Sequence, residues 1–215
     1  MWVFAGHSSK VLNYMKPTNT SVINGIHLRE AMQELDLPPE WAEFTIAVVV
    51  LTNNKAPGLN GVPPNSFKAM TEENLLHLFD FILEFWEDRL DFVEWHEGQV
   101  VLVPKIGDLS DPNKWRGVNL MDIGARVFNS MMFKRLFKVI KSYGYPTQFG
   151  SSPGVGCQDG QFFIKTAIHA RHKHNLGTYV DFVDLVKAFN TVSRAMLILE
   201  QYGVPHKFRS AIERM

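Results

Sequence analysis

The sequence predicts an α+β fold in which helices come first and strands and helices are mixed later in the chain. Amphipathic helical segments dominate the residues before position 98, where the first β-rich run begins. Further β-rich and helical segments follow in turn, without an internal repeat or a low-complexity tract. Because 46% of the 215 residues are hydrophobic and 12% are aromatic, the chain can bury a sizeable core, as one large domain or two small ones.

The N-terminal part begins with weakly patterned sequence and continues into a helix. Residues 1–36 include a polar run and predict a loop with a short helix at 28–35. Residues 37–51 predict a helix, because prolines lie near its first turn and apolar side chains recur on one face. The residues of that face are Trp41, Phe44, Val48 and Leu51.

A loop and a second amphipathic helix follow. Residues 52–65 are dense in Gly, Pro and Asn, so they predict a structured loop. Residues 71–90 predict a helix that Thr71 caps, with Glu72 and Glu73 in the first turn, where the helix dipole favours negative charge. Its apolar stripe consists of Leu75, Leu78, Phe79, Ile82, Phe85 and Trp86.

Two short β-rich runs then predict a hairpin. Residues 98–105 form the first run, which ends at a proline and a lysine. Residues 107–113 place Asp, Pro and Asn as a turn requires, and residues 115–122 are expected to form the returning strand. The hairpin would carry Lys105 and Arg116.

Helices dominate the remainder of the chain. Residues 125–144 predict a strong amphipathic helix that Gly144 terminates. Its predicted polar side holds Lys134, Arg135, Lys138 and Lys141. The remaining expected elements are a loop at 147–160, a helix at 161–175, a strand at 178–185, and helices at 193–203 and 206–215.

The composition predicts a soluble intracellular protein of the cytoplasm or nucleus. No apolar run approaches the roughly 18 residues that a membrane span needs, and the first ten residues lack the layout of a signal peptide. Cys157 is the only cysteine, so no internal disulfide can form, which suits a reducing compartment.

The charge is unevenly distributed along the chain although the formal net charge is zero. Residues 1–99 hold 6 Lys and Arg against 14 Asp and Glu, a balance of −8. Residues 100–215 hold 16 against 8, a balance of +8. This asymmetry hints at a polyanionic partner for the second half, and two ordinary solvated faces of opposite sign are the alternative.

Three other motifs do not indicate a site. The glycines at 154, 156 and 160 are one residue too widely spaced for a dinucleotide-binding turn and follow a loop instead of a strand, and no P-loop motif occurs. His169, His172 and His174 do not share a helical face as metal ligands must, so they predict a solvated polar face. Cys157 has no partner to orient a thiol nucleophile, which favours a structural role.

Two sets of charged residues are stronger candidates. Lys105 and Arg116 combine a point charge with a two-pronged donor, a combination suited to phosphate oxygens, although surface charge on a hairpin explains them too. Asp184 alternates onto one strand face with Val180 and Phe182, where a carboxylate must meet a cation, a metal or a donor. Its partner would be a buried arginine or a hard metal held for phosphate chemistry.

Four segments in order resemble the reverse transcriptases of non-LTR retroelements. "KAPGLNG" resembles the family's K-A-P-G-x-D-G signature, and "VVLVPKIGDLSDPNKWRGVNLMDIGARVF" resembles its segment of lysine, acidic turn, arginine and helix. "QFGSSPGVGC" resembles the Q-x-G loop, and "FVDLVKAFNTV" resembles F-x-D-x-x-K-A-F-D-x-V, which carries the first catalytic aspartate. Together the segments cover residues 55–192, and their order makes the match specific.

The resemblance implies the fingers and part of the palm of a right-hand polymerase. Its helical N-terminal part would precede a β-hairpin and an incomplete antiparallel palm sheet packed with helices. Residues 1–36 would form a weakly structured extension and residues 37–150 the fingers-like region. Residues 151–215 would form a partial palm, truncated at the C-terminus, that carries the first catalytic aspartate.

The resemblance also implies roles for single residues. Asp184 would be the catalytic carboxylate and, with the carbonyl of Leu185, would hold Mg²⁺ for a two-metal reaction. Lys105 and Arg116 would grip the triphosphate of an incoming deoxynucleotide. Phe189 would exclude the ribose 2′-hydroxyl. The remaining implied contacts are Lys187 and Ala188 beside the nucleotide, and Gln148 and Gly150 beside the template.

Electrostatics adds a further expected contact to an RNA template or DNA primer, through the backbone phosphates. The residues expected to make it are Lys134, Arg135 and Lys138 of the basic helix. No membrane partner is expected, and the sequence does not indicate an oligomeric state.

The sequence departs from the family pattern at several positions. Asn60 and Asn190 stand where acidic residues are common, Gly117 replaces a common proline, and Ser151 and Ser152 replace the commoner Phe-Arg. The family's second acidic motif needs two adjacent aspartates, and no Asp-Asp pair occurs in the chain. We therefore expect this chain not to extend a primer. The alternative to a polymerase fragment is an inactive remnant that binds RNA or DNA through its basic half.

Overall fold

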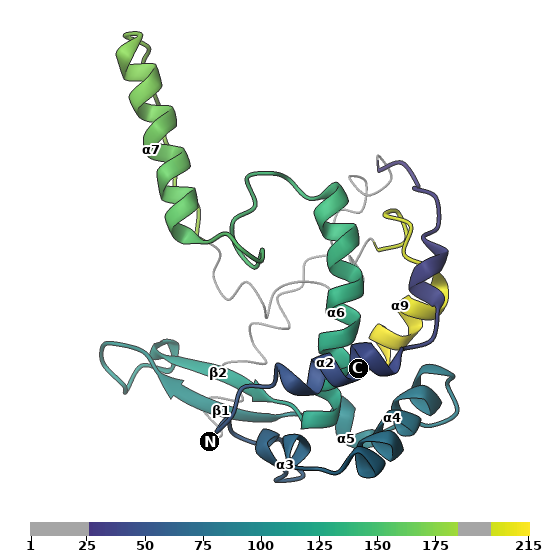
Figure 1. The fold of residues 1–215 in the computed structure, drawn as a ribbon. Helices are drawn as coiled ribbons and strands as arrows, with labels where there is room; N and C mark the ends of the chain where they lie inside the picture. Colours follow the sequence, from purple (N-terminus) through teal and green to yellow (C-terminus); the bar gives the residue numbers. More distant parts are fainter. Residues whose placement is uncertain (1–25, 185–198) are drawn as a thin grey trace.

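The computed structural model describes residues 26–184 and 199–215, which form helices and a two-stranded antiparallel sheet (Figure 1). The described elements are η2 (Gln33–Asp36), α2 (Trp41–Val49), α3 (Pro64–Lys68), α4 (Glu72–Trp86), α5 (Val93–His96), β1 (Gln99–Pro104), η3 (Pro112–Lys114), β2 (Trp115–Leu120), α6 (Ile123–Tyr143), α7 (Cys157–Lys173) and α9 (His206–Glu213). The composition is thus mainly helical with one hairpin, and it agrees with the α+β prediction at that level. No helix among these residues is both long enough and apolar enough to cross a membrane.

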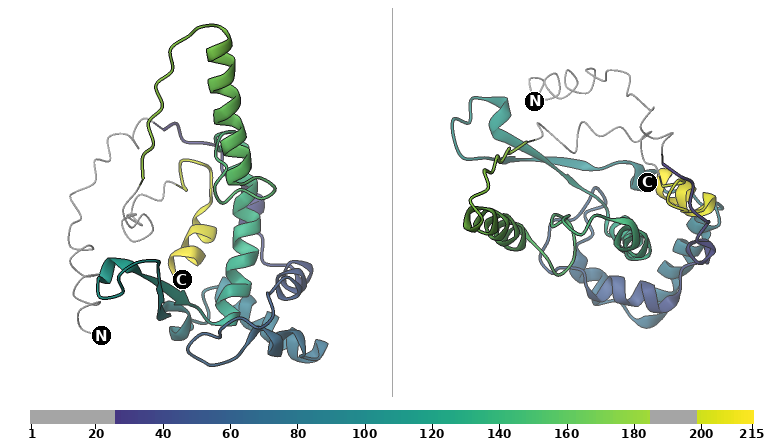
Figure 2. Two further views of the ribbon diagram at one scale, coloured as in Figure 1. Left: turned by 90° about the vertical axis from the view of Figure 1, so that its left-hand side faces the viewer. Right: turned by 90° about the horizontal axis from the view of Figure 1, so that it is seen from above.

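Helix α6 passes through the main hydrophobic core, and α2, α4 and α9 surround its lower part (Figures 1 and 2). Large aromatic side chains from each of these four helices are fully buried there. They are Phe44, Phe85, Trp86, Phe128 and Phe208. Because burying such side chains contributes about 1.5–3 kcal/mol each, this cluster holds the four helices together.

The predicted helices α2 and α4 are confirmed, and local chemistry sets where each begins. Glu40 precedes α2, and its backbone N–H donates to Glu43 Oε2 at 3.0 Å, which makes half of a capping box. Thr71 Oγ1 accepts the N–H of Asn74 at the start of α4, as predicted. The apolar stripe of α4 also faces the core as expected, with Phe79, Ile82, Phe85 and Trp86 buried.

The predicted helix at 28–35 is wrong for most of its length, because these residues pair with the C-terminal part of the chain. The N–H of Arg29 donates to the carbonyl of Gln201 at 2.9 Å, and that of Met32 donates to Gly203 at 2.8 Å. The backbone donors are therefore used across the structure instead of within a helix, and only the short η2 forms.

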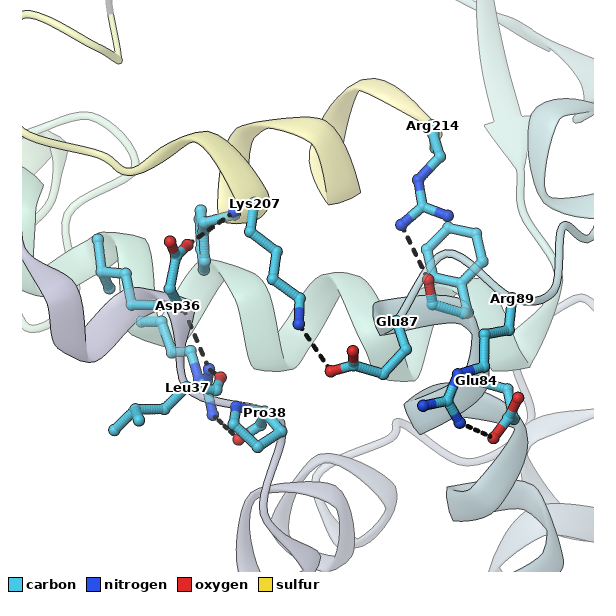
Figure 3. Close-up of polar contacts among 12 residues, drawn as sticks. Asp36, Leu37, Pro38, Glu84, Glu87, Arg89, Lys207 and Arg214 are labelled. Carbon is cyan, nitrogen blue, oxygen red and sulfur yellow. Dashed lines mark hydrogen bonds and ion pairs between the residues drawn. The ribbon is translucent and has the colours of Figure 1, made fainter.

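Helix α9, predicted from residues 206–215, is fastened at both ends (Figure 3). Asp36 Oδ1 accepts the N–H of Phe208 at 3.0 Å, so a carboxylate from η2 caps the first turn of α9. Lys207 Nζ pairs with Glu87 Oε1 at 2.6 Å, and Arg214 Nη2 donates to the carbonyl of Phe85 at 2.8 Å. The C-terminal segment is thereby joined to both η2 and α4.

The predicted hairpin is confirmed, and it projects away from the helices (Figure 1). Strands β1 and β2 pair from Gln99↔Leu120 to Pro104↔Trp115, with Val103 opposite Arg116. Both faces of the hairpin are exposed along nearly its whole length, because no described helix packs on either one.

The predicted helix α6 is confirmed, but the prediction that Arg135 lies on its polar side is wrong. The helix ends at Tyr143, and Gly144 follows it as predicted. Lys134, Lys138 and Lys141 are exposed on the expected polar side, but Arg135 is buried and points toward α2. The prediction grouped it with the lysines by its charge, because arginine is rarely buried unless paired. Its position, four residues after Met131 and four before Val139, instead belongs to the buried stripe of the helix.

The last part of the chain departs most from the prediction. Helix α7 begins at Cys157, earlier than the predicted residue 161, and it stands apart from the core without a buried residue (Figure 1). Residues 178–184 form no strand, because an extended segment needs a neighbouring strand for its hydrogen bonds and the described residues supply none. The predicted helix at 193–203 lies mostly outside the described residues, and its last residues form turns.

Candidate nucleotide and nucleic-acid interface

The register of the hairpin brings Lys105 and Arg116 to the same side. Val103 is opposite Arg116, and the N–H of Lys105 donates to the carbonyl of Lys114 at 2.7 Å, so the ladder continues one pair further. Side chains alternate along a strand, so Lys105 shares a face with Val103 and lies diagonally across from Arg116. Diagonal neighbours are about 7–8 Å apart, which both long side chains can bridge to one ligand.

Lys105 and Arg116 are both exposed on this hairpin face. Lys105 Nζ donates to the carbonyl of Asn113 at 3.3 Å, and no ion pair joins either cation to a carboxylate within the described residues. The same face also carries Lys114 opposite Lys105, the apolar residues Val101, Val118 and Leu120, and Gln99 at its far end. The arrangement offers the charges of Lys105, Arg116 and Lys114 to an anion without a competing acidic side chain on the two strands.

Hydrogen bonds within the tip of the hairpin hold the turn in place. Asp108 accepts the N–H of Ser110 at 2.9 Å and its hydroxyl at 2.8 Å, and these bonds lower the pKa of Asp108 below its ordinary value. Asp111 accepts the N–H of Asn113 at 2.9 Å, and Trp115 Nε1 donates to the carbonyl of Leu109 at 2.9 Å. The turn therefore fixes the ends of the strands that carry the two cations.

The loop at 55–61 is fastened to the start of α6. Asp122 is buried, and its Oδ1 accepts the N–H of Asn60 at 3.3 Å. A Cβ on Gly58 would lie 2.2 Å from the same oxygen, so this position needs glycine. Arg126 adds a hydrogen bond from Nη1 to the carbonyl of Ala56 at 3.5 Å. The loop, the end of β2 and the start of α6 therefore form one unit.

Sequence reasoning missed Asp122. The available signal was its position directly before an amphipathic helix, which indicates a helix cap and would have marked Asp122 as a structural residue. Its side chain makes no cap bond to α6. It accepts a hydrogen bond from the backbone of the loop at 55–61 instead. Asn60, where the family pattern has an acidic residue, accepts the N–H of Val62 through Oδ1 at 2.9 Å.

Three exposed lysines form a basic row on α6. Lys134, Lys138 and Lys141 are spaced by four and three residues, so they lie on one helical face. Arg135 does not belong to this row, because its guanidinium is used inside the protein.

Arg135 joins α6 to α2 and to the segment before it. Its Nε donates to Glu43 Oε1 at 2.8 Å, and its Nη2 bonds the other oxygen of the same carboxylate and the carbonyl of Pro38. Its Nη1 donates to the carbonyl of Leu37. Burial raises the pKa of Glu43, but the hydrogen bonds from Arg135 and Glu40 and the charges of Arg135 and Lys138 outweigh it and lower that pKa.

The loop with Gln148 and Gly150 is exposed and bonded to itself. Gln148 Nε2 donates to the carbonyl of Gly150 at 3.2 Å, and Ser152 Oγ donates to the carbonyl of Gln148 at 2.8 Å. These bonds define a local turn that precedes α7. A contact of these residues with a template stays a prediction.

The predicted catalytic residues are only partly within the described structure. Asp184 is exposed at the end of an extended segment, and no ion pair links it to Lys105 or Arg116 among the described residues. Leu185, Lys187, Ala188 and Phe189 lie outside the described residues.

The described residues do not fit a magnesium site. They include no group of three or more His, Cys, Asp or Glu side chains that could hold a metal ion. A hard divalent cation needs several oxygen ligands, and Asp184 alone supplies one carboxylate. The bound Mg²⁺ implied by the family resemblance therefore has no complete ligand set in this part of the chain.

Comparison with known proteins relates the chain to retroelements. No family model matches it. It is 27% identical to the retrovirus-related Pol polyprotein from the type-2 retrotransposable element R2DM of Drosophila melanogaster. The match extends over 157 residues, which is 72% of this chain. The transposon TX1 uncharacterized 149 kDa protein of Xenopus laevis is 24% identical over 185 residues, 85% of this chain. The putative 115 kDa protein in the type-1 retrotransposable element R1DM of Drosophila melanogaster is 29% identical over 157 residues, 68% of this chain.

These similarities show distant homology to the Pol proteins of retrotransposable elements. The predicted relationship to retroelements is confirmed at that level. The chain spans only 14–15% of the length of these three relatives.

Proposed function

We propose that this chain is part of an RNA-directed DNA polymerase of a non-LTR retrotransposon and that its hairpin binds the triphosphate of an incoming deoxynucleotide. The observation that carries the proposal is the strand register, which sets Lys105 diagonally across from Arg116 on one exposed face. The distant homology to Pol polyproteins supports the same assignment.

The chemistry of the hairpin face suits a triphosphate. The arginine guanidinium donates two parallel hydrogen bonds to phosphate oxygens, and the lysine adds a compact positive charge. The exposed ribbon can approach a ligand from outside the helical core, because no described helix covers it. The chain's own contribution would be to bind and orient the nucleotide.

In this proposal the lysine row of α6 contacts the backbone of the template or primer. Its three ammonium groups lie on one exposed helical face, and phosphate contacts of this kind release counterions. Replacing Lys134, Lys138 and Lys141 by glutamine should therefore weaken RNA binding. It should also lower the slope of log Kd against log salt by about 2, because each single-strand phosphate contact contributes about 0.7.

A second candidate function is nucleic-acid binding without catalysis. It is favoured by the lack of an Asp-Asp pair in the chain and by the asparagine at position 190. Primer extension on an RNA template separates the two candidates. Incorporation that is lost in Asp184→Ala would support the enzyme, and binding without incorporation would support the second candidate.

Nucleotide binding by the full chain tests the proposal directly. A fluorescent deoxynucleoside triphosphate would be titrated against the parent chain and against Lys105→Gln and Arg116→Gln. Each variant should bind roughly 10- to 150-fold more weakly, since a hydrogen bond to a charged group is worth about 1.5–3 kcal/mol. Lys68→Gln, at the exposed end of α3, is the matched control and should bind like the parent. Equal affinity of all four proteins would contradict the proposal.

A further inference from the structure

Two sides of helix α7 are occupied by neighbouring parts of the chain. The ring of Phe149 lies 6.0 Å from that of Phe163, on the side of the preceding loop. Arg171 holds the segment that follows the helix, because its Nε donates to Thr178 Oγ1 at 3.1 Å and its Nη2 donates to the carbonyl of Gly177 at 2.6 Å. Figure 1 shows this segment returning beside α7.

A third side of α7 is left open in the described structure. Positions three and four apart share a helical face, and here they form a row that we call the basic-aromatic face. Phe162 is its aromatic member and is 74% exposed, whereas Phe163, on the occupied side, is 52% exposed. The members of the face are Phe162, Lys165, His169, His172 and Lys173.

The charge on this face has no counter-ion in its own helix. Asp159 is the one acidic residue of α7, and its Oδ2 accepts the N–H of Gly156 at 2.7 Å in the first turn. Neither Lys165 nor Lys173 forms an ion pair within residues 26–184 and 199–215. The face therefore presents uncompensated positive charge around a large exposed ring.

We propose that the basic-aromatic face of α7 binds single-stranded nucleic acid. Aromatic rings that alternate with cations are the surface on which bases stack while phosphates pair with lysine or arginine. Imidazole rings stack on bases as well. A duplex keeps its bases paired and stacked on one another, so a flat exposed ring such as Phe162 favours a single strand. Lys165 and Lys173 are about 12 Å apart along the helix, at 1.5 Å per residue, so they can pair with different phosphates of one strand.

This contact surface is separate from the lysine row of α6, and it extends the proposed function. Binding of a labelled oligouridylate to the full chain, followed by fluorescence anisotropy, tests it. Phe162→Ala should weaken binding roughly 5- to 150-fold, the range for loss of one stacked base. Lys165→Gln with Lys173→Gln should lower the slope of log Kd against log salt by about 1.4, because two phosphate contacts are lost.

Matched controls come from the acidic half of the chain. Phe81→Ala removes a ring on α4 that is 49% exposed, and Lys68→Gln removes an exposed charge on α3; both should bind RNA like the parent. A blunt RNA duplex of equal length should bind more weakly than the oligouridylate, and Phe162→Ala should leave its affinity unchanged.

The results distinguish this inference from the proposed function. If the α7 variants bind like the parent while the α6 lysine variants bind weakly, the inference is overturned and the α6 contact stands. Equal competition by polyglutamate, together with no effect of Phe162→Ala, would overturn it too, because the face would then be a general anion-binding surface. Weaker binding in both α7 variants with intact controls would support it.

Discussion

Replacing Arg135 by methionine tests how the fold is held together. The side chain of Arg135 is 9% exposed and that of Glu43 is 29% exposed. Methionine keeps most of the buried volume but removes the guanidinium hydrogen bonds to the Glu43 carboxylate and to the carbonyls of Leu37 and Pro38. Removal of one partner from a buried ion pair costs about 3–5 kcal/mol. Because water reaches part of Glu43, we expect about 3 kcal/mol of lost stability, at the lower end of that range.

Urea denaturation followed by circular dichroism measures this loss as a change in the unfolding midpoint. Lys134→Met, at the exposed neighbouring position, is the control and should change stability by less than about 0.5 kcal/mol. Glu43→Leu combined with Arg135→Met should be more stable than Arg135→Met alone, since the double variant leaves no unpaired charge. An unchanged midpoint in Arg135→Met would refute the reasoning, and so would a double variant that loses the full sum of both single changes.

Three further predictions concern the long-range contacts of the fold. Gly58→Ala should destabilise the chain by about 1–3 kcal/mol, because its Cβ would overlap Asp122; an unfolding midpoint equal to that of the parent would show that the loop can shift away. Asp36→Ala should cost about 1 kcal/mol and raise hydrogen exchange in α9, because the N–H of Phe208 loses its acceptor; unchanged exchange would argue against the cap. The lowered pKa of Glu43 adds stability that is fully present above its ordinary value of 4.5 and is lost as the pH falls through the lower native value, so Glu43→Gln should flatten the acid limb of a stability–pH profile.

Local features of the sequence determined the elements that could be predicted. The apolar stripe of α4, the cap at Thr71 and the glycine after α6 are set by residues within a few positions of one another. The turn between β1 and β2 is likewise local, and it fixes the register that brings Lys105 and Arg116 together. The motifs that indicate a retroelement protein could also be read without coordinates.

Tertiary structure alone decided the features that depend on distant partners. Arg135 lies on the buried stripe of α6, and its charge can be buried there because Glu43, 92 residues away, supplies a carboxylate that the sequence around Arg135 does not indicate. Residues 29 and 32 leave the helical path because the turn at 201–203 accepts their N–H groups. Residues 178–184 form no strand because a ladder needs a second strand beside it, and none is present in the described structure. Local propensity sets what a segment can become, and the hydrogen-bond partners brought to it by the fold decide which outcome is realised.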